Sequence, residues 1–91
     1  MSERSSKELA QMLVVAQSQV TIGARYRHYK DRLYTVVTIA LNEETLEPCV
    51  VYQAEYGEKL IWIRPVSDWL KEVEWNGEIV PRFQLFSEKM L

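Results

Sequence analysis

The sequence predicts a mainly β domain: a small antiparallel barrel of the SH3-like or OB-like kind, preceded by one N-terminal amphipathic helix. Three observations support this fold class. Apolar residues recur at helical spacing only near the N-terminus. From Val20 onwards, short runs rich in β-branched and aromatic residues take their place. These runs are evenly spaced and separated by turn signals, which is typical of small barrels.

A chain of 91 residues has room for one domain. We expect a helix and lead-in over 1–22, a barrel over 23–86 and a tail over 87–91. No apolar run approaches the ~20 residues of a membrane span, and the N-terminus lacks the apolar region of a secretory signal. The single cysteine, Cys49, excludes an internal disulfide. These features predict a cytoplasmic protein with no membrane partner.

The N-terminal helix is expected over roughly residues 5–18. Ser5 and Glu8 have the spacing of a capping box, in which each side chain bonds the other residue's backbone N–H. The apolar face carries Leu9, Met12, Leu13 and Ala16, widened by Val14 and Val15. A face this wide must be covered, either by the rest of the domain or by a second copy in a homodimer.

The first strands follow a turn at Gly23. We expect one strand over 25–29, a tight turn at Lys30-Asp31-Arg32, and a second strand over 33–41. Strict alternation would put Leu33, Val37, Ile39 and Leu41 on one face of that strand, and Tyr34, Val36, Thr38 and Ala40 on the other.

The middle of the chain alternates between loops and strands. A polar loop over 42–48 leads to a strand over 49–56, with Val50, Tyr52, Ala54 and Tyr56 on one face. A turn at 57–59 leads to a strand over 60–64, whose pairing ends at Pro65 because proline lacks an N–H.

The last elements are short. A single helical turn is expected over 67–71, with Ser67 as its cap and Trp69 and Leu70 as anchors. Asn76-Gly77 between two short β runs predicts a tight hairpin. Phe83 is expected to complete the core, and the chain from Phe86 onwards to form a tail.

Several motifs occur together in this order: Gly23, Arg25-Tyr26-Arg27-His28-Tyr29-Lys30, Tyr34-Thr35-Val36, Glu44-Thr45, Val50-Val51-Tyr52, Trp62-Ile63-Arg64-Pro65, Val73-Glu74, Gly77 and Val80-Pro81-Arg82-Phe83. With them, residues 22–84 resemble domain-of-unknown-function family 1653, a family of small bacterial proteins. The resemblance implies an SH3-like barrel and supplies no activity. Asp31 stands where the family usually has glycine, although aspartate tolerates turn conformations. Trp69 stands where phenylalanine is usual.

Charge is distributed unevenly, although the net charge is only −2. Residues 25–34 carry four basic side chains against Asp31, a net of +3, whereas residues 35–60 carry five glutamates against Lys59, a net of −4. Such a pattern could steer an anion to one patch. Equally, neighbouring strands could pair these charges on a solvated face.

The candidate ligand-binding residues combine aromatic and cationic side chains on strands. They are Tyr26, His28 and Lys30, which share a parity, Trp62 and Arg64, which are two apart, and Arg82 and Glu44. An aromatic ring stacks on planar groups, and a guanidinium grips a carboxylate or phosphate. We therefore predict a non-catalytic binding module for an anionic or planar ligand, nucleic acid or nucleotide.

Other readings stay open. Trp62 could lie in the core, with Arg64 paired to Glu44 under the 42–48 loop as a structural lock. An aromatic groove could take a peptide. An enzyme would use His28 with Glu44, but no complete catalytic set is visible. No spacing of His28, Cys49 and glutamates suits a metal, and no cofactor motif occurs. Cys49 is expected to be a small core residue.

Overall fold

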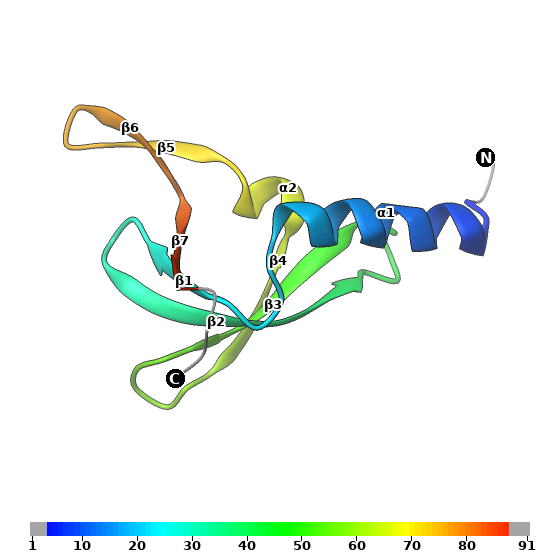
Figure 1. The fold of residues 1–91 in the computed structure, drawn as a ribbon, viewed down its shortest axis with the longest axis horizontal. Coiled ribbons are helices and arrows are strands. Elements are labelled where there is room, and N and C mark those ends of the chain that lie inside the picture. The colour runs from blue at the N-terminus through cyan, green and yellow to red at the C-terminus, as the bar shows by residue number, and fades with distance from the viewer. Residues whose placement is uncertain (1–3, 88–91) are drawn as a thin grey trace.

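The computed structural model describes residues 4–87. Figure 1 shows a long helix, a curved sheet and a projecting two-stranded hairpin. In chain order the elements are α1 (Ser6–Gln19), β1 (Arg25–His28), β2 (Arg32–Leu41), β3 (Pro48–Ala54), β4 (Ile61–Pro65), α2 (Val66–Trp69), β5 (Glu72–Trp75), β6 (Glu78–Pro81) and β7 (Phe83–Ser87). The mainly β class with one N-terminal helix is confirmed.

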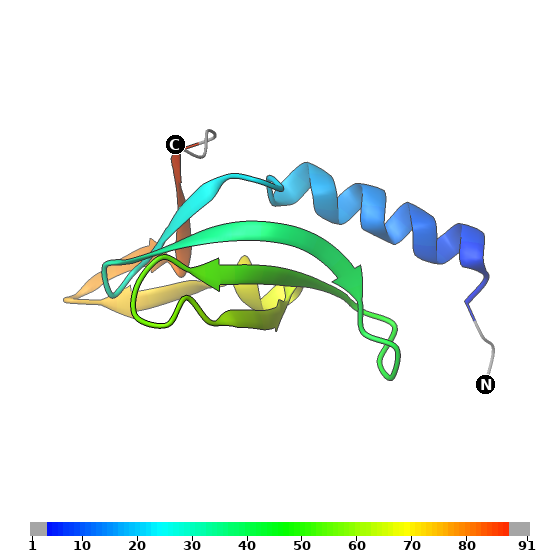
Figure 2. The same ribbon diagram turned by 90° about the horizontal axis from the view of Figure 1, so that it is seen from below.

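The main sheet has the strand order β4-β3-β2-β1-β7, and every neighbouring pair is antiparallel. The β5–β6 hairpin forms a second, separate sheet. Figure 2 shows the strong curvature of β2, which bends the sheet around the core. Within residues 4–87 no pairing joins β4 to β7, so these two strands are the edges of the sheet. The closed SH3-like barrel therefore stays a prediction.

Helix α1 begins as its sequence predicts. Ser5 Oγ accepts a hydrogen bond from the backbone N–H of Glu8, and the Glu8 carboxylate accepts one from the backbone N–H of Ser5. Ala16, and Val20 just beyond the helix, are buried against the sheet, while Val14 and Val15 stay exposed. The helix thus docks on its own domain through a narrow strip, and part of its apolar face is left open.

The faces of β2 differ from strict alternation. The pairing of β2 with β3 shifts register between Val36 and Thr38, which marks a β-bulge. Because the bulge adds one residue, Val36 and Ile39 both point into the core, although we predicted them on opposite faces. Val37, the extra residue, is exposed. The face assignment of β3 is confirmed for Val50, Tyr52 and Ala54, which are buried. It was wrong for Tyr56, which lies beyond the end of β3 at Ala54 and is exposed.

The core lies on one face of the sheet, here called the inner face. It contains Ala16, Val20, Ala24, Tyr26, Val36, Ile39, Val50, Tyr52, Val66, Trp69 and Phe83. Trp69 and Phe83 are the predicted anchors, and both are buried. Two details of the helical turn were wrong. Pro65 occupies the cap position of α2, which has no side-chain cap hydrogen bond, so Ser67 does not cap it. Leu70 is exposed.

Two turns use the left-handed backbone region. Asn76 has φ 53° and Gly77 has φ 81°, the paired positive values of a tight hairpin turn, so the predicted β5–β6 hairpin is confirmed. Asp31 has φ 70° in the turn between β1 and β2. Aspartate therefore adopts a conformation that suits glycine.

The chain ends differ slightly from expectation. Phe86 and Ser87, which we placed in or beside the tail, belong to β7, which pairs with β1. The rest of the predicted tail lies outside the described residues. No helix within residues 4–87 is both long and apolar enough to cross a membrane.

Candidate ligand-binding site

An aromatic cluster forms the floor of the inner face. The rings of Trp69 and Phe83 stack with centroids 3.6 Å apart and planes 2° apart. Tyr52 meets Trp69 edge-on at 4.9 Å, and Tyr26 meets it at 5.4 Å from another side. These contacts join β7, α2, β3 and β1, so the strands that carry the polar residues are held in fixed relative positions.

His28 ends β1 and lies at the border of this floor. Its ring is 5.0 Å from Phe83 and 6.5 Å from Tyr34, edge-on to both. Its Nδ1 accepts a hydrogen bond from the backbone N–H of Lys30 at 3.1 Å, which places the proton of the neutral ring on Nε2. Burial, followed by the charges of Arg64, Arg82 and Lys30, lowers the pKa of His28. The imidazole is therefore neutral at pH 7.

Arg64 is fixed on the same face. It forms an ion pair with Asp68 of α2, and its Nε donates to the Tyr52 hydroxyl at 3.4 Å. Its guanidinium also lies 5.8 Å from the centre of the Phe83 ring. Three contacts thus hold a planar cation against an aromatic floor, the arrangement that lets arginine recognise planar anions.

Arg82 differs from Arg64 because one nitrogen of its guanidinium has no hydrogen-bond partner within residues 4–87. Its backbone is tied at both ends, since its N–H donates to the Lys71 carbonyl and its carbonyl accepts from Tyr29 N–H, each at 3.0 Å. Its Nε is buried and has no hydrogen-bond acceptor within residues 4–87. Leaving such a group unpaired costs about 1–3 kcal/mol.

The carboxylate of Asp68 balances part of this positive charge. Burial would raise the pKa of Asp68, but its hydrogen bond with Arg64 and the charges of Arg64, Arg82 and Lys71 outweigh burial and lower it. Asp68 is therefore ionised, and it is shared by several cations. We call His28, Arg64 and Arg82, with Lys30 nearby, the cationic cluster.

Aromatic residues border the cluster. Trp62 is half exposed and pairs with Tyr52 across β3 and β4, which puts its ring on the same face as Arg64. The hydroxyls of Tyr34 and Tyr56 share a hydrogen bond of 2.6 Å. Burial and this bond raise the pKa of Tyr34, so its hydroxyl stays protonated. The border thus offers a stacking surface and neutral hydroxyls.

A cavity of about 290 Å³ adjoins His28 on the side of the β5–β6 hairpin. His28 and Tyr29 form one wall, and Trp75, Val80 and Pro81 form the opposite one. The Tyr29 and Trp75 rings lie 5.2 Å apart, edge-on. The hairpin therefore contacts the rest of the domain beside the cationic cluster. His28 belongs to this cluster and also lines the cavity.

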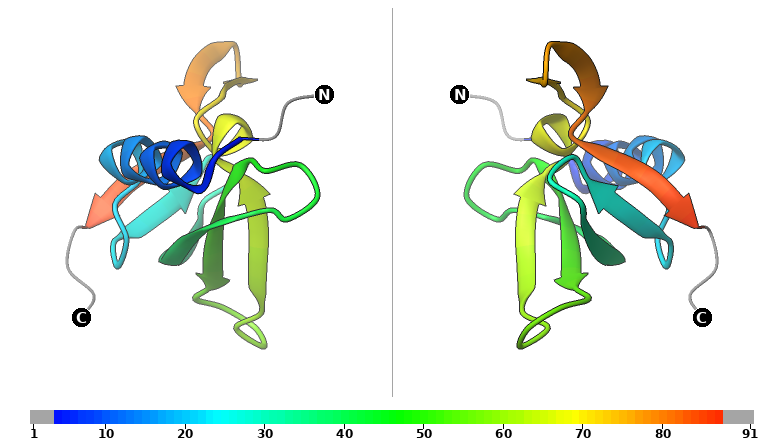
Figure 3. Two further views of the ribbon diagram at one scale, coloured as in Figure 1. Left: turned by 90° about the vertical axis from the view of Figure 1, so that its right-hand side faces the viewer. Right: turned by 90° about the vertical axis from the view of Figure 1, so that its left-hand side faces the viewer.

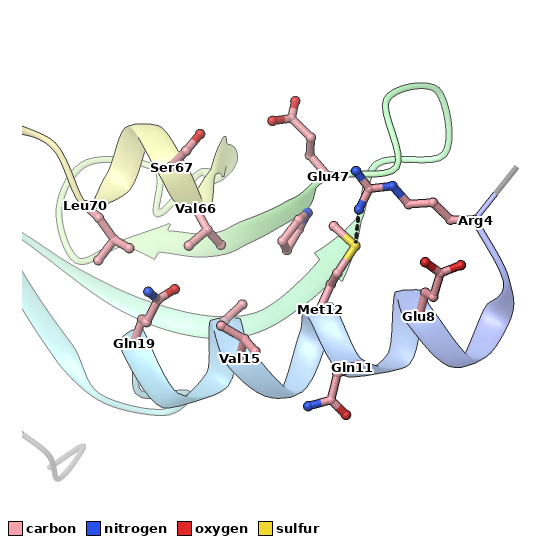
Figure 4. A pocket seen from close by; sticks show the side chains of 12 residues that line it. Arg4, Glu8, Gln11, Met12, Val15, Gln19, Glu47, Val66, Ser67 and Leu70 are labelled. Atoms are coloured by element: carbon pink, nitrogen blue, oxygen red, sulfur yellow. Dashed lines mark hydrogen bonds between the residues drawn. The ribbon is translucent and has the colours of Figure 1, made fainter. Parts of the chain in front are cut away.

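A larger groove, of about 630 Å³, lies away from the cluster between α1 and α2. Figure 4 shows Met12, Val15, Val66 and Leu70 in its apolar lining. Pro48 lines the groove as well. Arg4 Nη1 donates to the sulfur of Met12 at 2.7 Å at its outer end. This is the part of the helix face that the sheet does not cover.

The structure brings several predicted site residues together and separates others. His28, Arg64, Arg82 and Trp62 share the inner face. Tyr26 was wrong as a surface residue: it is 6% exposed, and its hydroxyl accepts from Thr21 N–H at 3.0 Å. The parity with Lys30 was also wrong, because β1 ends at His28 and Lys30 lies in the turn, 5.8 Å from the Tyr29 ring.

Glu44 does not reach the cluster. It lies in the loop beyond the Leu41↔Pro48 pair, at the end of β2 opposite to the Lys30 turn. Arg64 pairs with Asp68 instead, so the predicted Arg64–Glu44 lock was wrong, and Trp62 does not lie in the core. Arg64 and Asp68 belong to different elements, β4 and α2, so the helical i,i+4 rule did not point to this partner.

The basic segment is partly neutralised within the chain. Arg25 donates to both carboxylate oxygens of Glu55, which also accepts from Thr35 Oγ1 at 2.8 Å. Arg27 lies 3.6 Å from Asp31. Opposite charges therefore pair across the sheet as one of our two interpretations predicted, and the inner-face cations remain.

Metal-binding side chains and the single thiol were located in the described part of the chain. No group of three or more metal-binding side chains lies together within residues 4–87. Cys49 is buried, as expected for a small core residue, and burial raises the pKa of its thiol. A protonated, buried thiol is a poor nucleophile.

Comparison with known proteins agrees with this fold. No curated protein matches the chain. The chain is similar to the crystal structure of a DUF1653 protein from Bordetella bronchiseptica, with 30% sequence identity and a TM-score of 0.68 over 76% of this chain and 91% of that one. The model of the family described as "Protein of unknown function (DUF1653)" matches residues 24–85, and the chain therefore belongs to this family.

Proposed function

We propose that this chain is a non-catalytic binding module that holds an anionic ligand with a planar part, a nucleotide or single-stranded nucleic acid, at the cationic cluster. The observation that carries the proposal is the surplus of positive charge on the inner face. Arg64, Arg82 and Lys30 all help to lower the pKa of His28, and within residues 4–87 Asp68 is the carboxylate that forms an ion pair with one of them, Arg64.

The chemistry of a phosphate suits these groups. Arg64 is already oriented by Asp68 and Tyr52, so it loses little freedom on binding. Arg82 has a buried Nε–H that lacks an acceptor within residues 4–87. A phosphate beside the Arg82 guanidinium would accept a charge-assisted hydrogen bond, which is stronger than a neutral one. The Nε2–H of neutral His28 is a further donor.

The planar part of the ligand would lie on Trp62. Half of this side chain is exposed on the face that carries Arg64. Stacking of a base on an aromatic ring contributes about 1–3 kcal/mol and tolerates any base. The pairing of one ring with several cations thus favours nucleotides over simple anions.

We expect such a module, with the SH3-like architecture of the family, to act in the bacterial cytoplasm.

The enzyme alternative has less support from the same geometry. It would pair His28 with Glu44, and the two lie at opposite ends of β2. The Nδ1 of His28 is also occupied by the Lys30 N–H. This imidazole is therefore placed to donate a hydrogen bond rather than to relay a proton between two groups.

The direct test is the binding of a fluorescein-labelled oligothymidine, followed by anisotropy over a range of salt concentrations. We expect affinity to fall with salt, because the contacts are to phosphates. Arg82→Gln should weaken binding about tenfold, equivalent to about 1.4 kcal/mol. Lys7→Gln, which removes the same charge from the exposed surface of α1, should bind like the wild type. Undetectable binding at the lowest salt, or equal weakening by both variants, would sink the proposal.

The stacking contribution is tested separately. Trp62→Ala should weaken the oligonucleotide and leave inorganic phosphate binding unchanged, because phosphate has no planar part. Trp75→Ala, which removes a comparably exposed indole from the β5–β6 hairpin, is the matched control. Equal losses in the two variants would show that Trp62 has no specific role in ligand binding.

A further inference from the structure

Strand β4 is an edge of the main sheet and carries an unusually apolar exposed run. Ile61, Trp62 and Ile63 are 61%, 50% and 59% exposed. Figure 3 shows β4 as the outer strand, with β3 on one side of it only. Natural edge strands are usually protected by lysine, proline or a covering element, because free backbone groups invite pairing with another chain. Within 61–63 none of these protections is present.

The free backbone groups of β4 can be assigned. Ala54 N–H donates to the Leu60 carbonyl at 2.9 Å, so this pair directs its backbone groups towards each other. Hydrogen-bonded and non-hydrogen-bonded pairs alternate in an antiparallel ladder. In the register Tyr52↔Trp62, position 62 faces β3, whereas Ile61 and Ile63 direct their N–H and C=O groups outwards.

These outward groups complement those of a second copy. In an antiparallel pairing centred on Trp62, Ile61 of one copy lies opposite Ile63 of the other. Every outward N–H and C=O of both isoleucines then finds a partner. The isoleucines meet on the outer face of the sheet, and the Trp62 rings meet on the inner face.

Neighbouring registers fit less well. A pairing centred on Ile63 places Ile61 opposite Pro65, which has no N–H to donate. A pairing centred on Ile61 places Ile63 opposite Lys59, which has φ 55° and whose carbonyl already accepts from Gln53 Nε2 at 3.0 Å. Of these three registers, only the one centred on Trp62 pairs all the outward backbone groups of Ile61 and Ile63 when two β4 strands meet.

We infer that β4 is a homodimer edge, through which two copies of this chain form one continuous antiparallel sheet. The occupant is a second copy rather than an unrelated peptide, because the free groups and the apolar side chains are self-complementary in a single register. Only three residues of each copy lie at the centre of the contact, so the dimer is small and dissociates on dilution. The inference rests on the backbone of β4 rather than on the proposed ligand, but it shares Trp62 with the proposed stacking surface, because the partner's Trp62 lies beside it.

Sedimentation velocity over a range of concentrations, up to about 1 mM, tests the inference with two matched variants. Ile63→Lys adds a charge to the edge, and Val14→Lys adds one to the exposed apolar face of α1, at a position 57% exposed. We expect a concentration-dependent dimer for the wild type and for Val14→Lys, and a monomer for Ile63→Lys. Circular dichroism confirms that each variant is folded.

The other outcomes contradict the inference. A dimer lost in Val14→Lys and kept in Ile63→Lys would assign the interface to α1. Equal loss in both would indicate a general effect of charge. A wild type that stays monomeric at all concentrations would overturn the homodimer, and an extended peptide would then be the alternative partner of the β4 edge.

Amide hydrogen exchange followed by NMR gives a test without mutation. The amides of Ile61 and Ile63 should exchange rapidly at low concentration and become protected as the dimer forms. The Trp62 amide, which faces β3, should be protected at both concentrations. No change at positions 61 and 63 across a concentration range that shifts the sedimentation coefficient would overturn the proposed edge.

Discussion

Trp69 of α2 stacks face to face on Phe83 of β7, with ring centroids 3.6 Å apart and planes 2° apart. This contact joins α2, a helix outside the sheet, to β7, an edge strand of the main sheet. It also brings Arg82, the residue before Phe83, to the inner face beside Asp68. The stack is therefore both the centre of the core and the support of the cationic cluster.

Trp69→Ala should lower the free energy of unfolding by about 3–5 kcal/mol, because it removes a fully buried ring and leaves a cavity. Trp69→Phe should cost less because it keeps an aromatic contact with Phe83. Urea unfolding followed by circular dichroism measures both. Trp75→Ala, at an exposed ring, should cost well under half as much; similar losses in all three variants would contradict the assigned core.

Stability should decrease with acidification through His28. Its pKa is lowered in the folded chain from the ordinary 6.5, so the folded state binds fewer protons than the unfolded state below that pH. The contribution of the neutral ring is therefore complete above about pH 6.5 and is lost as the pH falls through the folded-state pKa. An NMR titration of the imidazole should give a midpoint below 6.5.

The same titration reports on the ligand. A bound phosphate would neutralise the surrounding cations and should raise the His28 midpoint. His28→Gln should remove the part of the pH dependence of unfolding that belongs to this group. A midpoint above 6.5 in the free protein would show that burial and the nearby cations do not lower the pKa of His28 as described.

Asp31→Gly should stabilise the chain by a few tenths of a kcal/mol up to about 1 kcal/mol, because glycine adopts φ 70° without a steric penalty. The exposed contact of Asp31 with Arg27, at 3.6 Å, contributes little against this gain. Asp31→Ala should destabilise, since alanine pays the penalty without a compensating side-chain bond. Thermal unfolding of the three proteins gives the order; alanine matching glycine would be inconsistent with the left-handed turn.

The loop between β2 and β3 should depend on Asn42 rather than on Glu44. The Oδ1 of Asn42 accepts hydrogen bonds from the backbone N–H groups of Glu44 and Thr45, at 2.8 and 3.1 Å. Asn42→Ala should speed amide exchange across residues 42–47, whereas Glu44→Ala should leave it unchanged, because no contact of the Glu44 side chain is seen within residues 4–87. Faster exchange in Glu44→Ala would revive the predicted ion-pair lock.

Local features of this fold could be predicted because they depend on residues close in the sequence. The capping box of Ser5 and Glu8 and the hairpin at Asn76-Gly77 each need only a few neighbouring residues. The buried face of β3 follows from a period of two, and Trp69 and Phe83 are large apolar residues that a small domain has to bury. The order of motifs also identified the family.

Contacts between distant elements were decided only by the tertiary structure. The sequence by itself could not tell that Arg64 pairs with Asp68 rather than Glu44, because either carboxylate has the right charge and chain topology sets which one is near. The bulge at Val37 reverses the faces of β2 without a local signal. Tyr26 is buried because the Trp69 ring of α2 packs against it and the Thr21 N–H, just beyond α1, donates to its hydroxyl. The exposed edge of β4 likewise exists because the sheet order ends there, which depends on the pairing of all five strands.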